Sequence, residues 1–209
     1  FNMSSKYPKK EIILNDKVEV IWDDIIAMSD GTQLRCDIFK PNDKGKYPVI
    51  ITYGPYGKWL HFSQLYSEQW QRMCEDHPDV PNGSSNIYQN WEVVDPEKWA
   101  TDGYVVIRVD SRGAGRSEGV MDLWSYQESV DFAECIEWAS QLEYSSGKVG
   151  INGISYYGMN QWQVASLQPK SLTAMCVWEG AADYYRELGY HGGIYLSLIH
   201  ISEPTRLST

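Results

Sequence analysis

The sequence predicts an α/β protein with a mostly parallel sheet and an antiparallel hairpin near its N-terminus. Two observations lead to this fold class. From residue 99 onward, short apolar runs alternate with helical segments, a pattern typical of right-handed βαβ crossovers between parallel strands. Nearer the N-terminus, Asp30-Gly31 separates two strand-like runs, which is a strong hairpin signal.

The expected strands are short runs rich in β-branched and aromatic residues. They cover residues 18–27, 33–40, 48–53, 104–110, 148–152 and 172–178. In the second run Leu34, Cys36 and Ile38 alternate with polar residues, which predicts one buried face. The third run is largely apolar and is typical of a strand buried on both faces.

Two helices are expected between the later strands. The first begins at Ser125, whose spacing from Glu128 predicts a capping box, and it extends to about residue 140. Its buried side is expected to carry Val130, Ala133, Ile136 and Trp138. The second helix covers residues 156–167 and stops before Pro169, because proline cannot continue a helix.

A long segment, residues 59–96, follows the third strand and has no clean period. It mixes aromatic residues with a cluster of helix and strand breakers. We expect an insertion over the sheet edge, with one short helix near residues 64–74. Connections of this length are often functional and often only decorative.

The two ends of the chain are set apart from the predicted domain. Residues 1–17 are expected to be an N-terminal extension, and residues 18–195 a partial α/β domain. Residues 196–206 match the in-frame translation of a transposase adapter used in sequencing libraries. Because such scars must be removed before fold reasoning, we expect residues 196–209 not to be native and give His200 no role.

Composition narrows the function classes. The formal net charge is −10 and no basic run interrupts it, which argues against nucleic-acid binding. No run of about 18 apolar residues exists, so no membrane span is expected. No cofactor or metal is predicted either, since the four cysteines are far apart and in no metal-ligand spacing. We expect buried free thiols and a cytoplasmic location, although a signal upstream of Phe1 is left open; the cysteines are Cys36, Cys74, Cys135 and Cys176.

The sharpest motif is residues 153–158, Gly-Ile-Ser-Tyr-Tyr-Gly, placed directly between a predicted strand and a predicted helix. A serine there sits on a sharp, strained turn at the carboxyl edge of the sheet. This context predicts that Ser155 is the nucleophile of an α/β-hydrolase fold. The helix that follows directs free N–H groups at a developing oxyanion, and the backbone N–H of Tyr156 is expected to be one donor. Taken alone, Gly-Ile-Ser is a weak motif, and a glycine-flanked serine is usually only a turn.

The commonest elbow has glycine two residues after the serine, whereas here Tyr157 holds that place and Gly158 follows it. This variant, followed by Gln161-Trp162, resembles the cocaine esterase and X-prolyl dipeptidyl peptidase family of serine hydrolases. Other stretches resemble the family at residues 30–41, 55–58, 110–119 and 178–186. The resemblance spans about residues 18–195 and implies an α/β-hydrolase domain cut before the family's cap and C-terminal jelly-roll domain.

By the same resemblance, Tyr56 matches the tyrosine whose phenol completes the oxyanion hole. A phenol that follows a sheet strand can reach the edge that carries Ser155, and it can donate to a tetrahedral intermediate. The alternative is an aromatic residue packed in a Pro-Tyr-Gly turn. Residues 110–119 lack the register of a phosphate-binding loop, so we expect Asp110 and Arg112 to brace loops beside the site.

A catalytic acid and base are missing from the pattern. In this fold they follow the serine in the order Asp or Glu, then His. His61 and His77 precede Ser155, and His191 follows it with too little chain for another strand and an acid. Asp183 comes after the next strand, whereas the family's acid lies beyond a cap insertion. We therefore expect both partners outside these 209 residues, and the chain as it stands to be inactive.

The resulting hypothesis is a serine hydrolase that cleaves small-molecule esters, amides or peptides, X-Pro peptides included, through an acyl-enzyme. The sequence does not separate these substrates, and it leaves the oligomeric state open. The alternative is a non-catalytic α/β-hydrolase relative that serves as a binding module.

Overall fold

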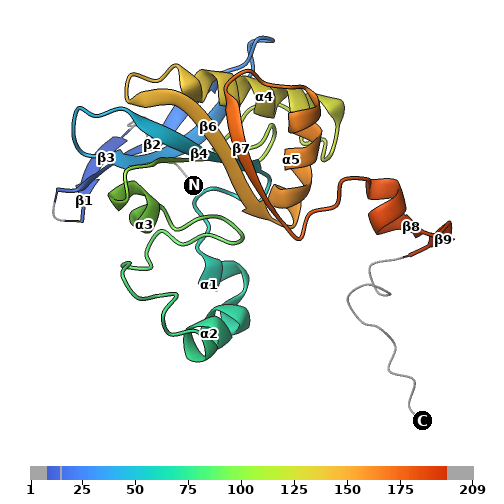
Figure 1. The fold of residues 1–209 in the computed structure, drawn as a ribbon, viewed down its shortest axis with the longest axis horizontal. Helices are drawn as coiled ribbons and strands as arrows, with labels where there is room; N and C mark the ends of the chain where they lie inside the picture. The colour runs from blue at the N-terminus through green and yellow to red at the C-terminus, as the bar shows by residue number, and fades with distance from the viewer. Residues whose placement is uncertain (1–8, 15, 197–209) are drawn as a thin grey trace.

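The computed structural model describes residues 9–14 and 16–196, so most of the tail expected at residues 196–209 lies outside the described residues (Figure 1). One mixed sheet forms the centre. Its strands are β1 (Lys9–Ile13), β2 (Val18–Ala27), β3 (Gln33–Pro41), β4 (Tyr47–Gly54), β5 (Val105–Asp110), β6 (Ser145–Ile154) and β7 (Leu172–Trp178). The spatial order is β1-β2-β3-β5-β4-β6-β7.

Strand directions confirm the predicted topology. β1, β2, β3 and β5 pair antiparallel in succession, whereas β5, β4, β6 and β7 pair parallel. The antiparallel hairpin is β2–β3, which turns where Gly31 takes a positive φ of 88°. Residues 9–13, expected to belong to an extension, add an edge strand to this hairpin.

Helices cover both faces of the sheet (Figure 1). They are α1 (Phe62–Leu65), α2 (Ser67–Asp76), α3 (Pro96–Thr101), α4 (Tyr126–Ser140) and α5 (Tyr156–Ser166). α4 and α5 pack on one face against β4 and β6, and α3 packs on the other against β3 and β5. The chain then continues through a short π-helix (Tyr185–Gly189) into the two-stranded β8 (Tyr190–His191) and β9 (Ile194–Tyr195).

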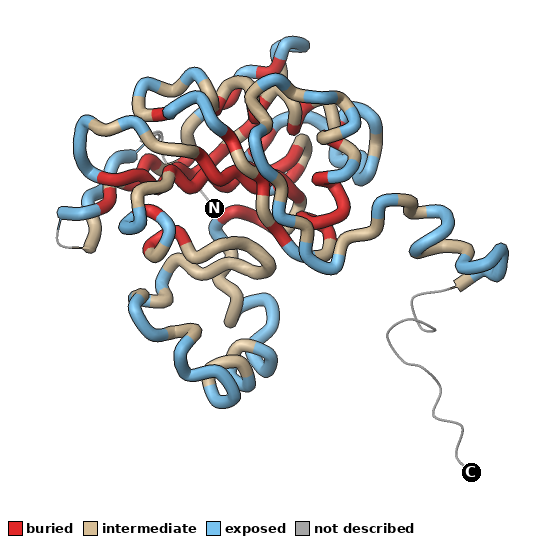
Figure 2. The backbone as a smooth tube through the Cα atoms, viewed as in Figure 1, coloured by how far each residue is buried: buried red, intermediate tan, exposed pale blue. Residues whose placement is uncertain are grey.

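The main core lies between the sheet and the α4–α5 layer, where the buried chain runs through the centre of the molecule (Figure 2). Leu34, Cys36 and Ile38 are fully buried, which confirms the predicted face of β3. Asp37 and Phe39 on its other face are buried as well. Phe39 packs in a second core beneath α3, so β3 is covered on both sides.

Helix α4 starts at Ser125 as predicted, but its buried face is different. The Ser125 hydroxyl accepts from the Glu128 N–H at 3.1 Å, while the Glu128 carboxylate bonds elsewhere and does not close the capping box. The buried positions are Glu128, Asp131, Phe132, Cys135, Ile136 and Ala139. Of the predicted set Ile136 is buried, and Ala133 and Trp138 are half-buried and pack against the main core. The two inward-facing acidic side chains obscure the apolar period.

The segment between β4 and α3 forms two helices, α1 and α2, where the sequence predicted one. Tyr66 separates them, and neither helix has a buried residue. Aromatic contacts join the two ends of the segment: Phe62 meets Trp91 edge-on and Tyr66 lies tilted against it, with ring centres 4.7 and 4.1 Å apart. The segment projects away from the sheet (Figure 1), and beyond Lys58 its residues up to Asp95 are half-buried or exposed (Figure 2).

The four cysteines are free thiols, as expected, but only Cys36 and Cys135 are buried. Cys74 is half-buried because it lies on α2, and Cys176 is exposed on β7, an edge strand of the described sheet. Among the described residues, none of the helices combines the length and the apolar character that crossing a membrane requires.

Candidate active site

Ser155 is the single residue between β6 and α5. Its φ of 55° and ψ of −115° lie in a region that non-glycine residues rarely adopt, at a cost of roughly 1–3 kcal/mol. Two elements hold it there. Its N–H donates to the Trp178 carbonyl at 3.0 Å, and its carbonyl accepts from Gly158 and Met159 at 2.9 and 2.7 Å. Ser155 is half-buried and its hydroxyl bonds none of the described residues.

The two glycines of the motif allow close backbone passage. A Cβ at Gly153 would lie 2.2 Å from the Tyr157 Cβ, and one at Gly158 would lie 2.6 Å from the Trp178 carbonyl oxygen. Tyr157 takes the place of the usual second glycine because Gly54, at the end of β4, leaves room for its ring. The displaced glycine therefore reflects a different packing of the same turn.

Tyr56 follows β4 by two residues and lies beside the elbow. Its ring meets those of Tyr156 and Tyr157 edge-on, with ring centres 5.9 and 5.5 Å apart. Burial and the nearby Glu92 raise the pKa of Tyr56 to about 12, so the phenol keeps its proton near neutral pH. The structure thus brings a hydrogen-bond donor to the residues that follow Ser155.

Tyr156 contributes its side chain to the support of the elbow. Its phenol donates to both oxygens of Glu128 at 2.6 and 2.7 Å, and its ring stacks on Trp124. This bond ties the first turn of α5 to the first turn of α4. The backbone N–H of Tyr156 lies in the first turn of α5, where N–H groups have no partner within the helix.

Glu92 is a neighbour that sequence reasoning missed. Its carbonyl accepts from the Ile154 N–H at 3.2 Å, directly before the serine. Its φ is 61°, and one carboxylate oxygen is buried without a hydrogen bond from the described residues. Burial, reinforced by the charge of Glu179, raises the pKa of Glu92 to about 7. Only an irregular loop precedes it, so no periodic signal could have revealed its position.

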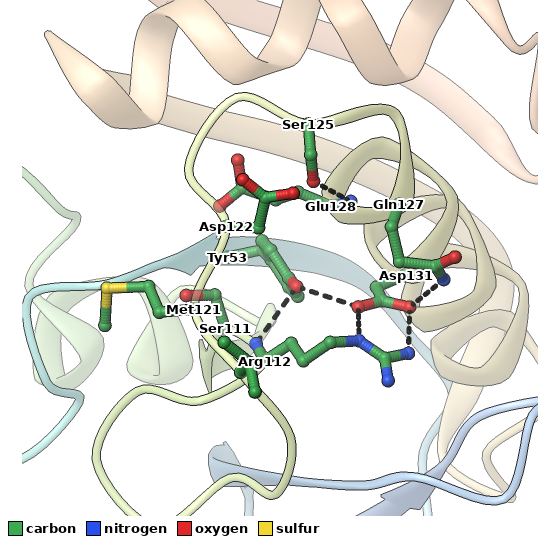
Figure 3. A pocket seen from close by; sticks show the side chains of 10 residues that line it. Tyr53, Ser111, Arg112, Met121, Asp122, Ser125, Gln127, Glu128 and Asp131 are labelled. Atoms are coloured by element: carbon green, nitrogen blue, oxygen red, sulfur yellow. Dashed lines mark hydrogen bonds and ion pairs between the residues drawn. The ribbon is translucent and has the colours of Figure 1, made fainter.

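Arg112 braces the loop that follows β5, as the sequence predicted. Its guanidinium forms two 2.7 Å bonds to Asp131 on α4 (Figure 3). A third nitrogen lies 2.9 Å from Asp30 of the hairpin. Tyr53 and Gln127 also donate to Asp131. A cavity of about 500 Å³ lies beside this cluster, and Ser155 is not among its lining residues.

No histidine of the described residues hydrogen-bonds Ser155. His61 caps α1 and uses its ring nitrogens on Ser63 and the Asn86 carbonyl. His191 contacts the Glu187 carbonyl. Within residues 9–14 and 16–196, the geometry therefore places the Ser155 hydroxyl at the start of a helix, near a phenol, with no base bonded to it.

Comparison with known proteins identifies the family of this chain. The family model for the X-Pro dipeptidyl-peptidase (S15 family) matches residues 30–201. The chain belongs to the X-Pro dipeptidyl-peptidase (S15) family. This agrees with the expected resemblance, and the fold is that of the α/β-hydrolases.

Relatives of this S15 chain include esterases and peptidases. It is 29% identical over 174 residues to the cocaine esterase of Rhodococcus sp. (strain MB1 Bresler), covering 83% of this chain and 26% of the esterase. A CocE/NonD family hydrolase from Staphylococcus aureus has 38% identity and a TM-score of 0.71, over 84% of this chain and 30% of that one.

A third neighbour shows the fold alone. The aminopeptidase from a marine sediment Thaumarchaeota archaeon has 18% identity and a TM-score of 0.60, over 90% of this chain and 30% of that one. The S15 chain thus spans roughly a quarter to a third of the length of these relatives.

Proposed function

We propose that this chain carries the nucleophile and oxyanion donors of a serine hydrolase that acts on carboxylic esters or amides, X-Pro peptides included. The observation that carries the proposal is the backbone of Ser155. With a φ of 55° and a ψ of −115°, Ser155 forms the strained strand-to-helix turn between β6 and α5 that is typical of a nucleophilic serine in an α/β-hydrolase fold. Beside it stand a phenol and the first N–H groups of a helix.

The chemistry follows from this arrangement. Ser155 Oγ attacks the substrate carbonyl carbon, and its proton passes to a base. The carbonyl oxygen, now negative, accepts hydrogen bonds from the Tyr156 N–H and the Tyr56 phenol. The leaving alcohol or amine departs with a proton, and water then releases the acid from the acyl-enzyme. Removal of one such donor costs about 10²–10³ in kcat.

The base and its acid come, in this proposal, from polypeptide outside the described residues. The described histidines are held at other places, and the relatives are three to four times longer than the matched region. A net charge of −10 supports a small-molecule substrate over nucleic acid. The free thiols support a reducing compartment such as the cytoplasm.

A fluorophosphonate probe tests the nucleophile. We expect the full-length protein to be labelled and Ser155→Ala to lose all labelling. Ser166→Ala is the matched control, because Ser166 lies at the far end of α5 and bonds only the Gln163 carbonyl. Labelling that survives Ser155→Ala would dispose of this assignment, and an unlabelled wild type would favour a binding module.

A further inference from the structure

Lys58 is a charged side chain buried two residues after Tyr56. Only 4% of the side chain is exposed, and its Nζ lies 2.8 Å from Asp37 Oδ1 and 3.1 Å from Asp23 Oδ1. Burial alone would lower the pKa of Lys58, but the carboxylates around it outweigh this effect and raise it, so the ammonium stays charged. Burying an ion costs several kcal/mol before pairing, so Lys58 can remain buried in this loop only because the carboxylates around it offset that cost.

The backbone of Lys58 is anchored as firmly as its side chain. Its N–H donates to Asp110 Oδ1 at 2.6 Å, at the carboxyl end of β5. Its carbonyl accepts from Asn90 Nδ2 at 2.6 Å, from the long insertion. Three separate parts of the fold therefore meet at one residue of the loop that carries Tyr56.

A β-bulge supplies part of this anchor. The pairing of β2 with β3 shifts between Ile21 and Asp24, and Asp23 takes a positive φ of 59°. Bulges re-aim side chains, and this one turns the Asp23 carboxylate inward toward Lys58. Asp23 also pairs with Arg116 at 2.8 Å, and its N–H donates to Asp37 at 2.8 Å. The irregular pairing of β2 with β3 thus helps to hold the loop that carries Tyr56 and Lys58.

Tyr56 needs such support. Among the described residues its phenol makes no hydrogen bond, and the aromatic rings that its own ring contacts, Tyr156 and Tyr157, meet it edge-on. An oxyanion donor acts by being in place before charge develops, and a misplacement of about 1 Å can cost up to 10²-fold in rate. The position of the ring depends on the loop beneath it.

We propose that Lys58 is a positioning residue, which pins the loop so that the Tyr56 phenol faces the developing oxyanion. This inference rests on the proposed function. Lys58 itself touches neither substrate nor Ser155; it acts through Tyr56. Substitution of Lys58 should therefore lower kcat and leave KM nearly unchanged. The loss should disappear when residue 56 has no phenol.

The test compares two charge-balanced double variants of the full-length protein, with p-nitrophenyl acetate as the probe ester. Lys58→Met with Asp37→Asn removes one charge of each sign from the cluster. Lys40→Met with Glu19→Gln is the matched control, since that partly buried pair, 2.6 Å apart, joins β2 to β3 and does not contact the loop that carries Tyr56. We expect the first to lower kcat at least tenfold with KM within twofold, and the control to change kcat less than twofold.

A double-mutant cycle with Tyr56→Phe separates positioning from general weakening of the fold. In the Tyr56→Phe background, the Lys58 and Asp37 changes should alter kcat less than twofold. A tenfold loss that persists there, or no loss in the wild-type background, overturns the proposal. If the double variant unfolds, Asn90→Ala provides a second test, because it removes only the side-chain bond to the Lys58 carbonyl. Its effect on kcat must likewise disappear in the Tyr56→Phe background.

The outcomes also separate this inference from the proposed function. If Tyr56→Phe leaves kcat unchanged, the oxyanion role of Tyr56 fails and the positioning role fails with it. If Tyr56→Phe lowers kcat but the Lys58 variants do not, the proposed function stands and only the inference is lost.

Discussion

Gly54 at the end of β4 lies directly against the ring of Tyr157, so that a Cβ on Gly54 would stand 2.5 Å from the ring carbon Cε1. Strand β4 and the elbow after β6 are thus fitted to each other by one missing side chain. The fit explains why this elbow carries a tyrosine where the commonest form has glycine. It also predicts which small substitutions the site cannot accept.

Gly54→Ala should push the Tyr157 ring from its place and cost about 1–3 kcal/mol of unfolding free energy, as overpacking does. Gly150→Ala, in the neighbouring β6, is the control, because its Cβ would meet nothing nearer than 3.6 Å. Urea unfolding measures both. The unfolding free energy lost through Gly54→Ala should be smaller when Tyr157 is also changed to alanine. If the losses from the two substitutions simply add, the steric explanation is wrong.

Glu92 should make stability depend on pH. Its pKa is raised from 4.5 to about 7, first by burial and then by Glu179, so the folded state favours the protonated form. This contribution is fully present below about pH 4.5 and is lost as the pH rises through 7. Glu92→Gln should therefore gain Tm relative to the wild type between pH 5 and pH 8. Melting curves that shift in parallel at both pH values would refute this reading.

The bond between Tyr156 and Glu128 should support the start of α5. Tyr156→Phe deletes the hydroxyl that donates to the buried carboxylate of Glu128. A hydrogen bond to a charged group contributes about 1.5–3 kcal/mol. We expect a loss of that size in the free energy of unfolding. Because the backbone N–H of residue 156 remains, fluorophosphonate labelling of the full-length protein should persist, which separates the two roles of this residue.

Asp131 should be critical to the brace shown in Figure 3. It is fully buried, and it pairs with both nitrogens of the Arg112 fork at 2.7 Å. Asp131→Asn removes the buried one of the two carboxylates that pair with Arg112 and leaves only the more exposed Asp30; breaking a buried pair typically costs about 3–5 kcal/mol. Asp183→Asn breaks the exposed pair with Arg186 and should leave the unfolding midpoint unchanged. Equal losses in the two variants would show that burial is not the cause.

Sequence reasoning located the elements well where the signal was local. Strand β6, Ser155 and helix α5 are consecutive, so their order is visible in the residues themselves. It did less well on α4, whose inward-facing Glu128 and Asp131 replace apolar residues in the pattern. The same acidic residues turn out to bond Tyr156 and Arg112, and neither partner is near them in sequence.

The sequence by itself determined the alternation of strands and helices, the hairpin at Gly31 and the turn that holds Ser155. Each of these depends on residues within one turn or one strand of each other, and short-range sterics leave a readable pattern. Only the tertiary structure brought Glu92 to the residue before the serine and closed the charges of Asp23, Asp37 and Asp110 around Lys58. Those partners lie 21 to 62 residues apart, where chain folding, not local preference, sets the distance.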